Sequence, residues 1–338
     1  MRRHSLRSNQ ASHRLLVVLI AQAPLRVSLL GGGSDLPAFL EQAPGSVLSF
    51  AIDRRVFLAG HPFTHRSGIL LKYSKTEDVE SPSDLVHPIA RVVLERYGIN
   101  DIDLAVMADV PAGTGLGSSS SFTVVMLTFA HHLVNKKVTA AETAAEAVEI
   151  EVDVLGEPIG YQDQWASAVG GINALHFEGR AVHVEPLQVT KDQVSQLQSH
   201  LFLVPVGSPR SASDLLKIQR DSLNESSETF RATCEIRDLV PLGVSAIAKD
   251  ISALGPLLHQ SWEIKRRLGA GISNSAVDEA YERGMNAGAT GGKLLGAGGS
   301  GYLLFFVPEG KQSQFKASVP KPLDFTIARQ GAGIIHES

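Results

Sequence analysis

The chain has 338 residues, 43% of them hydrophobic and 20% charged, a length that allows two domains or one large one. Its formal net charge of −4, from 31 Lys and Arg against 35 Asp and Glu, argues against a nucleic-acid-binding face and a polybasic membrane patch. The single cysteine, Cys234, excludes a disulfide within the chain and a cysteine-rich zinc site.

The N-terminus combines basic residues at 1–13 with a short apolar run, Leu15–Ala21, and an A-x-A pattern that superficially resembles a secretory signal. The continuation PLRVSLL reads as part of the same folded unit, and cleavage after Ala23 would remove the strand before it. We therefore expect residues 1–13 to be a polar extension. Because the apolar run is too short to span a membrane, we expect a cytoplasmic protein without membrane or nucleic-acid partners.

The first half of the chain is rich in predicted strands. Short β-branched or leucine-rich runs bounded by Gly, Pro and Asp predict strands at Leu15–Ile20, Leu25–Leu30, Ser46–Ile52, Val56–Ala59, Ile69–Tyr73, Ile102–Met107, Asn173–Phe177 and Ala181–Val184. Helices are predicted at Pro88–Tyr97, Ser118–Val134 and Ala140–Leu155.

The pattern changes after residue 190. A strand at Phe202–Val206 leads into a capped helix start in GSPRSASDLLKIQ. Helices around Phe230–Leu254, Leu257–Leu268 and Ala276–Ala287 follow, and then a buried strand in YLLFFVP. Strands followed by mixed helices and strands predict an α+β architecture. We place an N-terminal domain at 14–190 and a C-terminal domain at 191–338.

Three segments are dense in glycine, serine and threonine: Leu29–Pro37, Pro111–Ser121 and Gly288–Tyr302. In the middle segment, the glycines allow backbone N–H groups to converge on an anion just before a helix N-terminus, where phosphate binds readily. Ser118–Ser121 can cap this helix and offer hydroxyls to phosphate or Mg²⁺. A plain serine-capped helix is the alternative. One cap does not need four serines and three glycines, so we favour phosphate binding.

Two common nucleotide-binding motifs do not fit. A Walker loop needs G-x-x-x-x-G-K-[ST], but Gly292–Lys293 is followed by Leu294. The pattern G-x-G-x-x-G occurs at 296–301, but a strand-like run follows it where a dinucleotide fold opens a helix. An oxidoreductase is therefore disfavoured, and bound phosphates must be neutralised by backbone groups, Mg²⁺ and residues from elsewhere.

Isolated charges mark further candidates. Arg26 stands alone in an apolar strand, which is costly unless it points at a partner or a site; an edge-strand arginine facing solvent is the alternative. Glu149, Glu151 and Asp153 lie on a predicted helix, and a turn then leads to Asp163. Glu151 and Asp163 are close enough in sequence to reach one Mg²⁺-phosphate site. The alternative, a surface helix with scattered carboxylates, fits Glu149 and Asp153 well but fits Asp163 poorly, because Asp163 follows a turn.

Taken together, these motifs resemble those of the GHMP kinases, from about Ala23 to about Val307. The three family motifs occur in order as APLRVSLLGGGSDL, DVPAGTGLGSSSSF and KLLGAGGSGYLLFF. Segments such as GGGSDLPAF and SWEIKRRLGAGISN are similar to the branch of D-glycero-D-manno-heptose 7-phosphate kinases, which serves surface-polysaccharide synthesis. The resemblance implies a two-domain GHMP kinase fold. Its N-terminal half would be like domain 2 of ribosomal protein S5, its C-terminal half would be ferredoxin-like, and ATP and substrate would lie between them.

The resemblance also implies roles for individual residues. Asp163 matches the catalytic aspartate, which acts as base or holds the substrate hydroxyl in line, and Arg26 matches the basic residue paired with it. Ser119 and Glu151 match two Mg²⁺ ligands. The loop that binds the ATP phosphates corresponds to Gly113, Thr114, Gly115, Leu116, Gly117, Ser118, Ser119 and Ser120.

The implied substrate positions are Gly32, Gly33, Ser34 and Asp35, with Gly298 from the third glycine-rich segment. Galactokinases carry Glu-His-Thr-Asp where this chain has Gly-Gly-Ser-Asp. The loss of Glu and His disfavours galactose, and the retained aspartate favours a polyol.

A phosphorylated substrate requires a second anion pocket. One candidate is Arg210 with Ser208 and Ser211, just before a predicted helix start. The other is the basic cluster at 265–267, formed by Lys265, Arg266 and Arg267, for which a solvated helix face is the alternative.

The sequence therefore predicts an ATP- and Mg²⁺-dependent kinase that phosphorylates the anomeric C1 hydroxyl of heptose 7-phosphate to the 1,7-bisphosphate. Galactose, fucose or mannose 6-phosphate remain alternative substrates. A non-catalytic sugar or nucleotide sensor on the same fold is disfavoured, because every expected catalytic position is filled. The anomer, the adenine pocket and a homodimer are left open.

Overall fold

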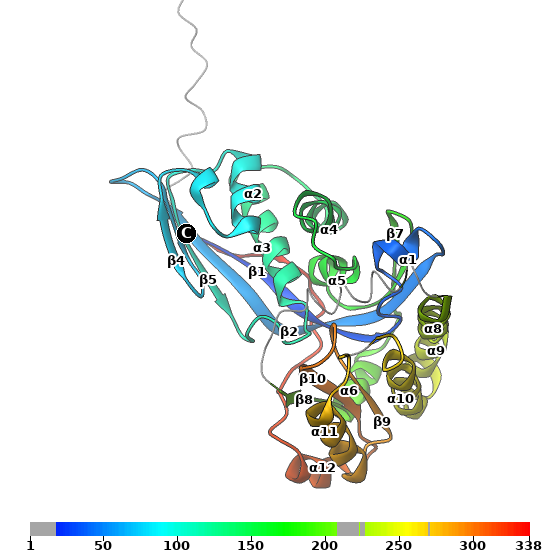
Figure 1. Ribbon diagram of the computed structural model, residues 1–338. Helices are drawn as coiled ribbons and strands as arrows, with labels where there is room; N and C mark the ends of the chain where they lie inside the picture. Colours follow the sequence, from blue (N-terminus) through cyan, green and yellow to red (C-terminus); the bar gives the residue numbers. More distant parts are fainter. Residues whose placement is uncertain (1–17, 208–222, 224–226, 270) are drawn as a thin grey trace, which may run out of the picture.

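The computed structural model describes residues 18–207, 223, 227–269 and 271–338, and two sheets organise them (Figure 1). The larger sheet contains β1 (Leu19–Leu30), β2 (Gly45–Pro62), β3 (Ile69–Lys72), β4 (Thr76–Val79), β5 (Ile102–Ala108), β6 (Ile172–Glu178), β7 (Ala181–Pro186) and β11 (Gly333–Glu337). Its order is β11-β1-β2-β5-β3-β4, with β6 paired to the first part of β2 and β7 paired to β6. The smaller sheet is antiparallel, with the order β8-β10-β9, and contains β8 (Leu201–Val206), β9 (Gly291–Leu294) and β10 (Gly301–Phe306).

Two pairs of expected strands are each one continuous strand. The runs predicted before and after residue 53 both lie in β2. The run predicted after residue 23 lies in β1 together with Leu19 and Ile20 of the run before it, whose residues 15–17 are outside the described part. The charged residues inside β2 do not end it because a distant segment binds them. Asp53 accepts a hydrogen bond from the Thr326 backbone N–H (2.7 Å), and Arg54 donates one to the Asp324 carbonyl (2.7 Å). Their partners lie about 270 residues further along the chain, so the local sequence pattern could not predict that the strand continues.

Helices cover one face of the larger sheet (Figure 1). They are α2 (Pro88–Tyr97), α3 (Ser118–Leu133), α4 (Ala140–Val148) and α5 (Gln162–Val169), and α3 and α5 pack on β1 and β2. The expected helix Ala140–Leu155 is α4 followed by a π-helical turn, η2 (Glu149–Val154). Short elements complete this half: α1 (Pro37–Leu40) and the 3₁₀ turn η1 (Pro82–Asp84).

The helical elements of the C-terminal half are α6 (Lys191–His200), α8 (Ser227–Asp238), α9 (Val240–Lys249), the 3₁₀ turn η3 (Ile251–Ala253), α10 (Leu254–Lys265), α11 (Ser275–Asn286) and α12 (Gln312–Ser318), of which α10 and α11 pack on the smaller sheet. The expected helix Phe230–Leu254 is divided into α8 and α9, because Pro241 lacks the N–H that a continuous helix needs and instead lies in the first turn of α9. The G-x-G-x-x-G pattern leads into β10, so the context argument against a dinucleotide fold is confirmed.

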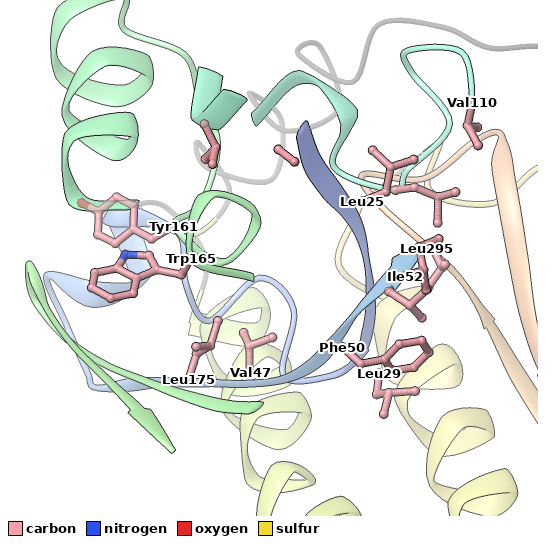
Figure 2. Packing of buried hydrophobic residues seen from close by; sticks show 14 of the residues in the cluster. Leu25, Leu29, Val47, Phe50, Ile52, Val110, Tyr161, Trp165, Leu175 and Leu295 are labelled. Carbon is pink, nitrogen blue, oxygen red and sulfur yellow. The ribbon is translucent and has the colours of Figure 1, made fainter. Parts of the chain in front are cut away.

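One continuous hydrophobic core joins the two halves. Figure 2 shows Leu295, which follows β9, among the same buried side chains as Leu25, Ile52 and Val110 of the N-terminal half. Helices α8 and α9 also contact β2. This shared packing fixes the two halves against each other at the place where their glycine-rich segments meet.

The chain returns to the larger sheet at its C-terminal end. Ile327 bridges to Ile52, and β11 pairs with the outer edge of β1. The expected boundary at residue 190 falls between β7 and α6 and stays a prediction, since the last residues lie with the N-terminal half. Among the described residues, no helix is long and apolar enough to cross a membrane.

Candidate functional site

A pocket of about 510 Å³ is lined by both halves of the chain. All three glycine-rich segments reach it, through Gly32 and Gly33, through Gly113, Gly115 and Gly117, and through Gly296 and Gly298. The predicted catalytic and metal-binding residues Arg26, Ser119, Glu151 and Asp163 line it as well. The structure thus brings together in one cavity residues that lie up to about 270 positions apart.

The middle glycine-rich segment forms a turn that opens directly into α3. Its three glycines have left-handed φ angles of 75°, 79° and 75° at Gly113, Gly115 and Gly117. A Cβ on Gly115 would lie 2.7 Å from the Leu295 carbonyl oxygen, so the close approach of the third glycine-rich segment requires glycine here. The helix N-terminus, with its unsatisfied N–H groups, therefore faces the pocket, as phosphate binding needs.

The four consecutive serines are not equivalent. Ser118, Ser119 and Ser120 line the pocket, and Ser119 is the exposed one of the three. Ser121 is turned into the protein, where its hydroxyl donates to the Pro24 carbonyl oxygen (2.9 Å). Ser119 is therefore the serine whose hydroxyl is most available to a ligand.

We expect Gly115→Ala to raise the KM for ATP by about tenfold, because the new methyl group would meet the Leu295 carbonyl and strain a left-handed residue. Gly179→Ala is the matched control: its φ is +56° and nothing lies within 4 Å of the added Cβ. Initial-rate kinetics against ATP tests this. A KM within twofold of wild type in both variants would contradict the phosphate-binding role of the turn.

Arg26 and Asp163 form a two-pronged ion pair at the centre of the pocket. Arg26 Nε lies 2.7 Å from Asp163 Oδ1, and Nη2 lies 2.8 Å from Oδ2. The third arm, Nη1, donates to the Gly115 carbonyl oxygen at 2.6 Å. Arg26 is 4% exposed on an internal strand, so a solvent-facing edge arginine is ruled out. The arginine ties the glycine turn before α3 to the carboxylate at the start of α5.

Glu151 is buried beside the start of α3. Its carboxylate accepts hydrogen bonds from Thr123 Oγ1 (2.8 Å), Gln164 Nε2 (2.5 Å) and the Ser120 hydroxyl. Desolvation outweighs these bonds and raises the pKa of Glu151 to about 7. The π-helical turn places this side chain inward, whereas Glu149 pairs with Arg96 at the surface. Asp153 similarly pairs with Arg180 at the surface, as a solvated helix face predicts.

Asp35 anchors the turn after β1 at the other end of the pocket. Its carboxylate accepts hydrogen bonds from the Gly33 N–H (3.0 Å), the Gln162 N–H (3.1 Å) and Gln162 Nε2 (3.0 Å). Burial is the main cause that raises its pKa, and the charge of Asp163 adds to it. Gln162 directly precedes Asp163, so this network ties the turn at Gly32 and Gly33 to the Asp163 carboxylate.

Three predicted contacts do not present their side chains to the pocket. Ser34 is fully buried, and its hydroxyl donates to the Gly31 (2.8 Å) and Ser46 (2.9 Å) carbonyl oxygens, so its expected contact with substrate is corrected to a structural role in the turn. The side chains of Thr114 and Leu116 are also buried, which leaves these residues to contribute backbone groups.

The predicted basic cluster at 265–267 separates in the structure. Lys265 lines the pocket, whereas Arg266 pairs with Glu263 and Asp278, and Arg267 pairs with Glu235. The other predicted anion pocket, with Ser208, Arg210 and Ser211, lies outside the described residues.

Sequence reasoning missed Lys293 as a site residue. It lies on β9, is 3% exposed and lines the pocket. The context Gly292–Lys293–Leu294 excludes a Walker lysine, and the position of Lys293 in the third family motif is the one sequence signal that points to the pocket.

Comparison with known proteins agrees with this geometry. The family described as GHMP kinases N terminal domain matches residues 84–171, and GHMP kinases C terminal matches 244–324. The D-glycero-alpha-D-manno-heptose 7-phosphate kinase of Campylobacter jejuni is 27% identical over 330 residues, covering 92% of this chain and 96% of that protein. The bifunctional fucokinase/GDP-fucose pyrophosphorylase of Arabidopsis thaliana is 26% identical over 325 residues, covering 87% of this chain and 30% of that protein.

Solved structures share the fold. A D-glycero-D-manno-heptose 1-phosphate kinase from Bacteroides thetaiotaomicron superposes with a TM-score of 0.77 at 23% identity, covering 94% of this chain and 99% of that one. Lactococcus lactis galactokinase complexed with galactose superposes with a TM-score of 0.69 at 17% identity, covering 94% and 95%. The predicted α+β GHMP kinase fold is confirmed. The chain belongs to the GHMP kinases and is a phosphotransferase with an alcohol group as acceptor.

Proposed function

We propose that the protein is a sugar kinase that transfers the γ-phosphoryl group of ATP to the anomeric C1 hydroxyl of D-glycero-D-manno-heptose 7-phosphate, giving the 1,7-bisphosphate. The observation that carries the proposal is the Asp163 carboxylate, held by Arg26 beside the glycine turn at the N-terminus of α3. The similarity to a heptose 7-phosphate kinase over 92% of the chain supports the choice of substrate.

The acceptor hydroxyl would be held between Asp163 and the turn after β1. Arg26 uses one lone pair of each Asp163 oxygen, and a carboxylate oxygen retains a second lone pair for the sugar hydroxyl. Asp163 would take the hydroxyl proton or orient the hydroxyl oxygen as it attacks phosphorus and ADP leaves. Asp35 and the Gly32 N–H would contact further hydroxyls of the sugar, whereas the Gly33 N–H is already donated to Asp35.

The donor phosphates would bind the N-terminus of α3 and its glycine turn, and Arg26 would hold Asp163 against this turn. Ser119 and Glu151 suit Mg²⁺, which prefers oxygen ligands and is commonly held by one or two carboxylates plus phosphates. Glu151 fits because it is a buried carboxylate on the pocket, and among the described residues no cationic side chain hydrogen-bonds to it. A bound Mg²⁺ would supply positive charge that offsets part of the charge on the ATP phosphates.

An ADP-release assay over a panel of acceptors tests the proposal. The panel contains heptose 7-phosphate, mannose 6-phosphate, galactose and fucose at fixed ATP and Mg²⁺. We expect the highest kcat/KM for heptose 7-phosphate, and a product whose new phosphorus signal couples to the anomeric proton. Activity confined to unphosphorylated hexoses would defeat the proposed substrate, and absence of ADP release with every acceptor would favour a sensor.

A further inference from the structure

Two lysines of the C-terminal half line the pocket without a carboxylate partner. Lys265, at the end of α10, donates to the carbonyl oxygens of Leu294 (3.0 Å) and Gly296 (2.5 Å). Lys293, on β9, donates to the Leu29 carbonyl oxygen (2.9 Å). Neither forms an ion pair with any carboxylate in the part of the chain that the structure describes. Buried lysines are ordinarily paired, so this arrangement calls for an anion that enters the pocket.

Three buried serines around these lysines have hydroxyls without a hydrogen-bond partner among the described residues. Ser261 lies one helical turn before Lys265 on α10 and is 1% exposed. Ser28 lies two residues after Arg26 on β1, and Ser300 directly precedes β10. All three line the pocket. Unpartnered buried hydroxyls are uncommon in proteins, and here they gather on the same cavity as the two ammonium groups.

We propose that Lys265 and Lys293, with Ser28, Ser261 and Ser300, form a second anion subsite that binds the phosphate monoester of the acceptor sugar. This inference rests on the proposed function and assigns the acceptor phosphate to residues other than Arg210. A phosphate monoester carries nearly two negative charges and three acceptor oxygens. An ammonium group has three N–H donors, so Lys265 keeps one free and Lys293 keeps two. With three hydroxyls, the subsite offers six donors.

The position of the lysines favours the acceptor over the donor as the source of this phosphate. The donor phosphates have their own cradle in the glycine turn and the N-terminus of α3. Lys293 is instead bound to Leu29, which leads into the acceptor turn at Gly32, and Ser28 Oγ would lie 3.3 Å from a Cβ on Gly32. Lys293 thus lies beside the acceptor turn. Lys265 lies between the two turns, because its partner Gly296 packs against Gly115 of the glycine turn, so the assignment to the acceptor rests on Lys293.

The shifted pKa values of the two lysines also support binding of an anion in the pocket. Desolvation, with repulsion from Arg26, lowers the pKa of Lys265 to about 7. Desolvation also lowers the pKa of Lys293 well below its ordinary value, and Lys265 and Arg26 add to this. The other ionisable groups on the pocket are Asp35, His87, Glu151, Glu157 and Asp163. A phosphate dianion would raise both lysine pKa values, so binding at pH 8 should draw protons from solution.

Methionine variants test the subsite by steady-state kinetics. We expect Lys265→Met and Lys293→Met each to raise the KM for heptose 7-phosphate about tenfold to a hundredfold, while the KM for ATP stays within twofold. Arg267→Met is the matched control, because Arg267 is paired with Glu235 at the surface. Inorganic phosphate should compete with the acceptor in the wild-type enzyme and lose this effect in both lysine variants.

The outcomes distinguish binding of the acceptor phosphate from binding of the ATP phosphates, and they distinguish failure of the subsite from failure of the proposed function. A raised KM for ATP with an unchanged KM for the acceptor would assign the lysines to the donor, and unchanged values for both would make them structural; either overturns the subsite. A wild-type enzyme active only on unphosphorylated sugars would instead defeat the proposed function. If the variants do not fold, calorimetry on the wild-type protein at pH 8 in two buffers decides. Net proton uptake on binding heptose 7-phosphate but not ADP supports the subsite, and its absence overturns it.

Discussion

Asp163→Asn is expected to lower kcat by about 10³-fold and to leave the affinity for ATP within twofold of wild type. Asparagine has the size of aspartate but no charge, and its NH₂ group would face one of the Arg26 donors that now meet Oδ1 and Oδ2. The acceptor hydroxyl would lose the group that orients it or takes its proton. The glycine turn and the N-terminus of α3, which hold the donor, would be unchanged.

Turnover is measured by ADP release, and ATP affinity by titration with a fluorescent ATP analogue. Asp153→Asn is the control. Asp153 is also a carboxylate and lies only ten residues before Asp163 in the chain, but it pairs with Arg180 at the surface. Near-normal turnover in Asp163→Asn would contradict a catalytic role for the Asp163 carboxylate. Loss of ATP binding together with turnover would show that the carboxylate supports the donor site instead.

The residues of the site that were predictable from sequence are those within local motifs. The glycine turn before α3 and the turn at Gly32–Asp35 are recognisable by their high content of glycine and serine. The predicted catalytic roles of Arg26 and Asp163 came from the family resemblance. Contact between those two residues spans 137 positions, and the unusual place of Arg26 in an apolar strand was its only physical signal. Sequence did not separate Ser34 from its neighbours, because its inward rotation depends on the Ser46 carbonyl of the adjacent strand.

Lys293 could not be assigned from sequence for a different reason. A lysine in a short glycine-rich strand reads as an exposed edge residue, because buried lysines are rare. Its burial depends on contact between β9 and the end of β1, which belong to different halves of the chain. Similarly, the arginines next to Lys265 were indistinguishable from it until their surface partners were placed.

Secondary structure was predicted best where the pattern was local. The spacing at 88–97 matches α2, and the strands β5 and β8 lie within a residue of their expected bounds. The errors occur where distant contacts override the local pattern. One is β2, which continues through charged residues bound by the C-terminal segment. Another is the end of the expected helix Ala140–Leu155, where the chain forms the π-helical turn η2 in place of a continuous α-helix.

Arg26→Met is expected to lower kcat by about 10²-fold to 10³-fold and to destabilise the fold by about 3 kcal/mol. The variant removes both hydrogen bonds to Asp163 and the one to the Gly115 carbonyl, and it leaves a partly buried carboxylate without its counter-ion. Arg26→Lys keeps a charge but cannot span both carboxylate oxygens and the turn, so its kcat should lie between those of wild type and Arg26→Met. Chemical unfolding and ADP release measure the two effects.

A double-mutant cycle with Asp163→Asn determines how Arg26 acts. If Arg26 works by fixing Asp163, Arg26→Met should lower kcat less than tenfold further in the Asp163→Asn background, because the group that it positions has already been removed. If Arg26 acts on the transferred phosphoryl group by itself, the two losses should multiply. The geometry favours the first outcome: two of the three arms of the guanidinium contact Asp163, and the third contacts the Gly115 carbonyl of the turn that cradles the donor. Multiplicative losses would show that the main role of Arg26 is to stabilise charge on the phosphoryl group, even though it forms the ion pair with Asp163.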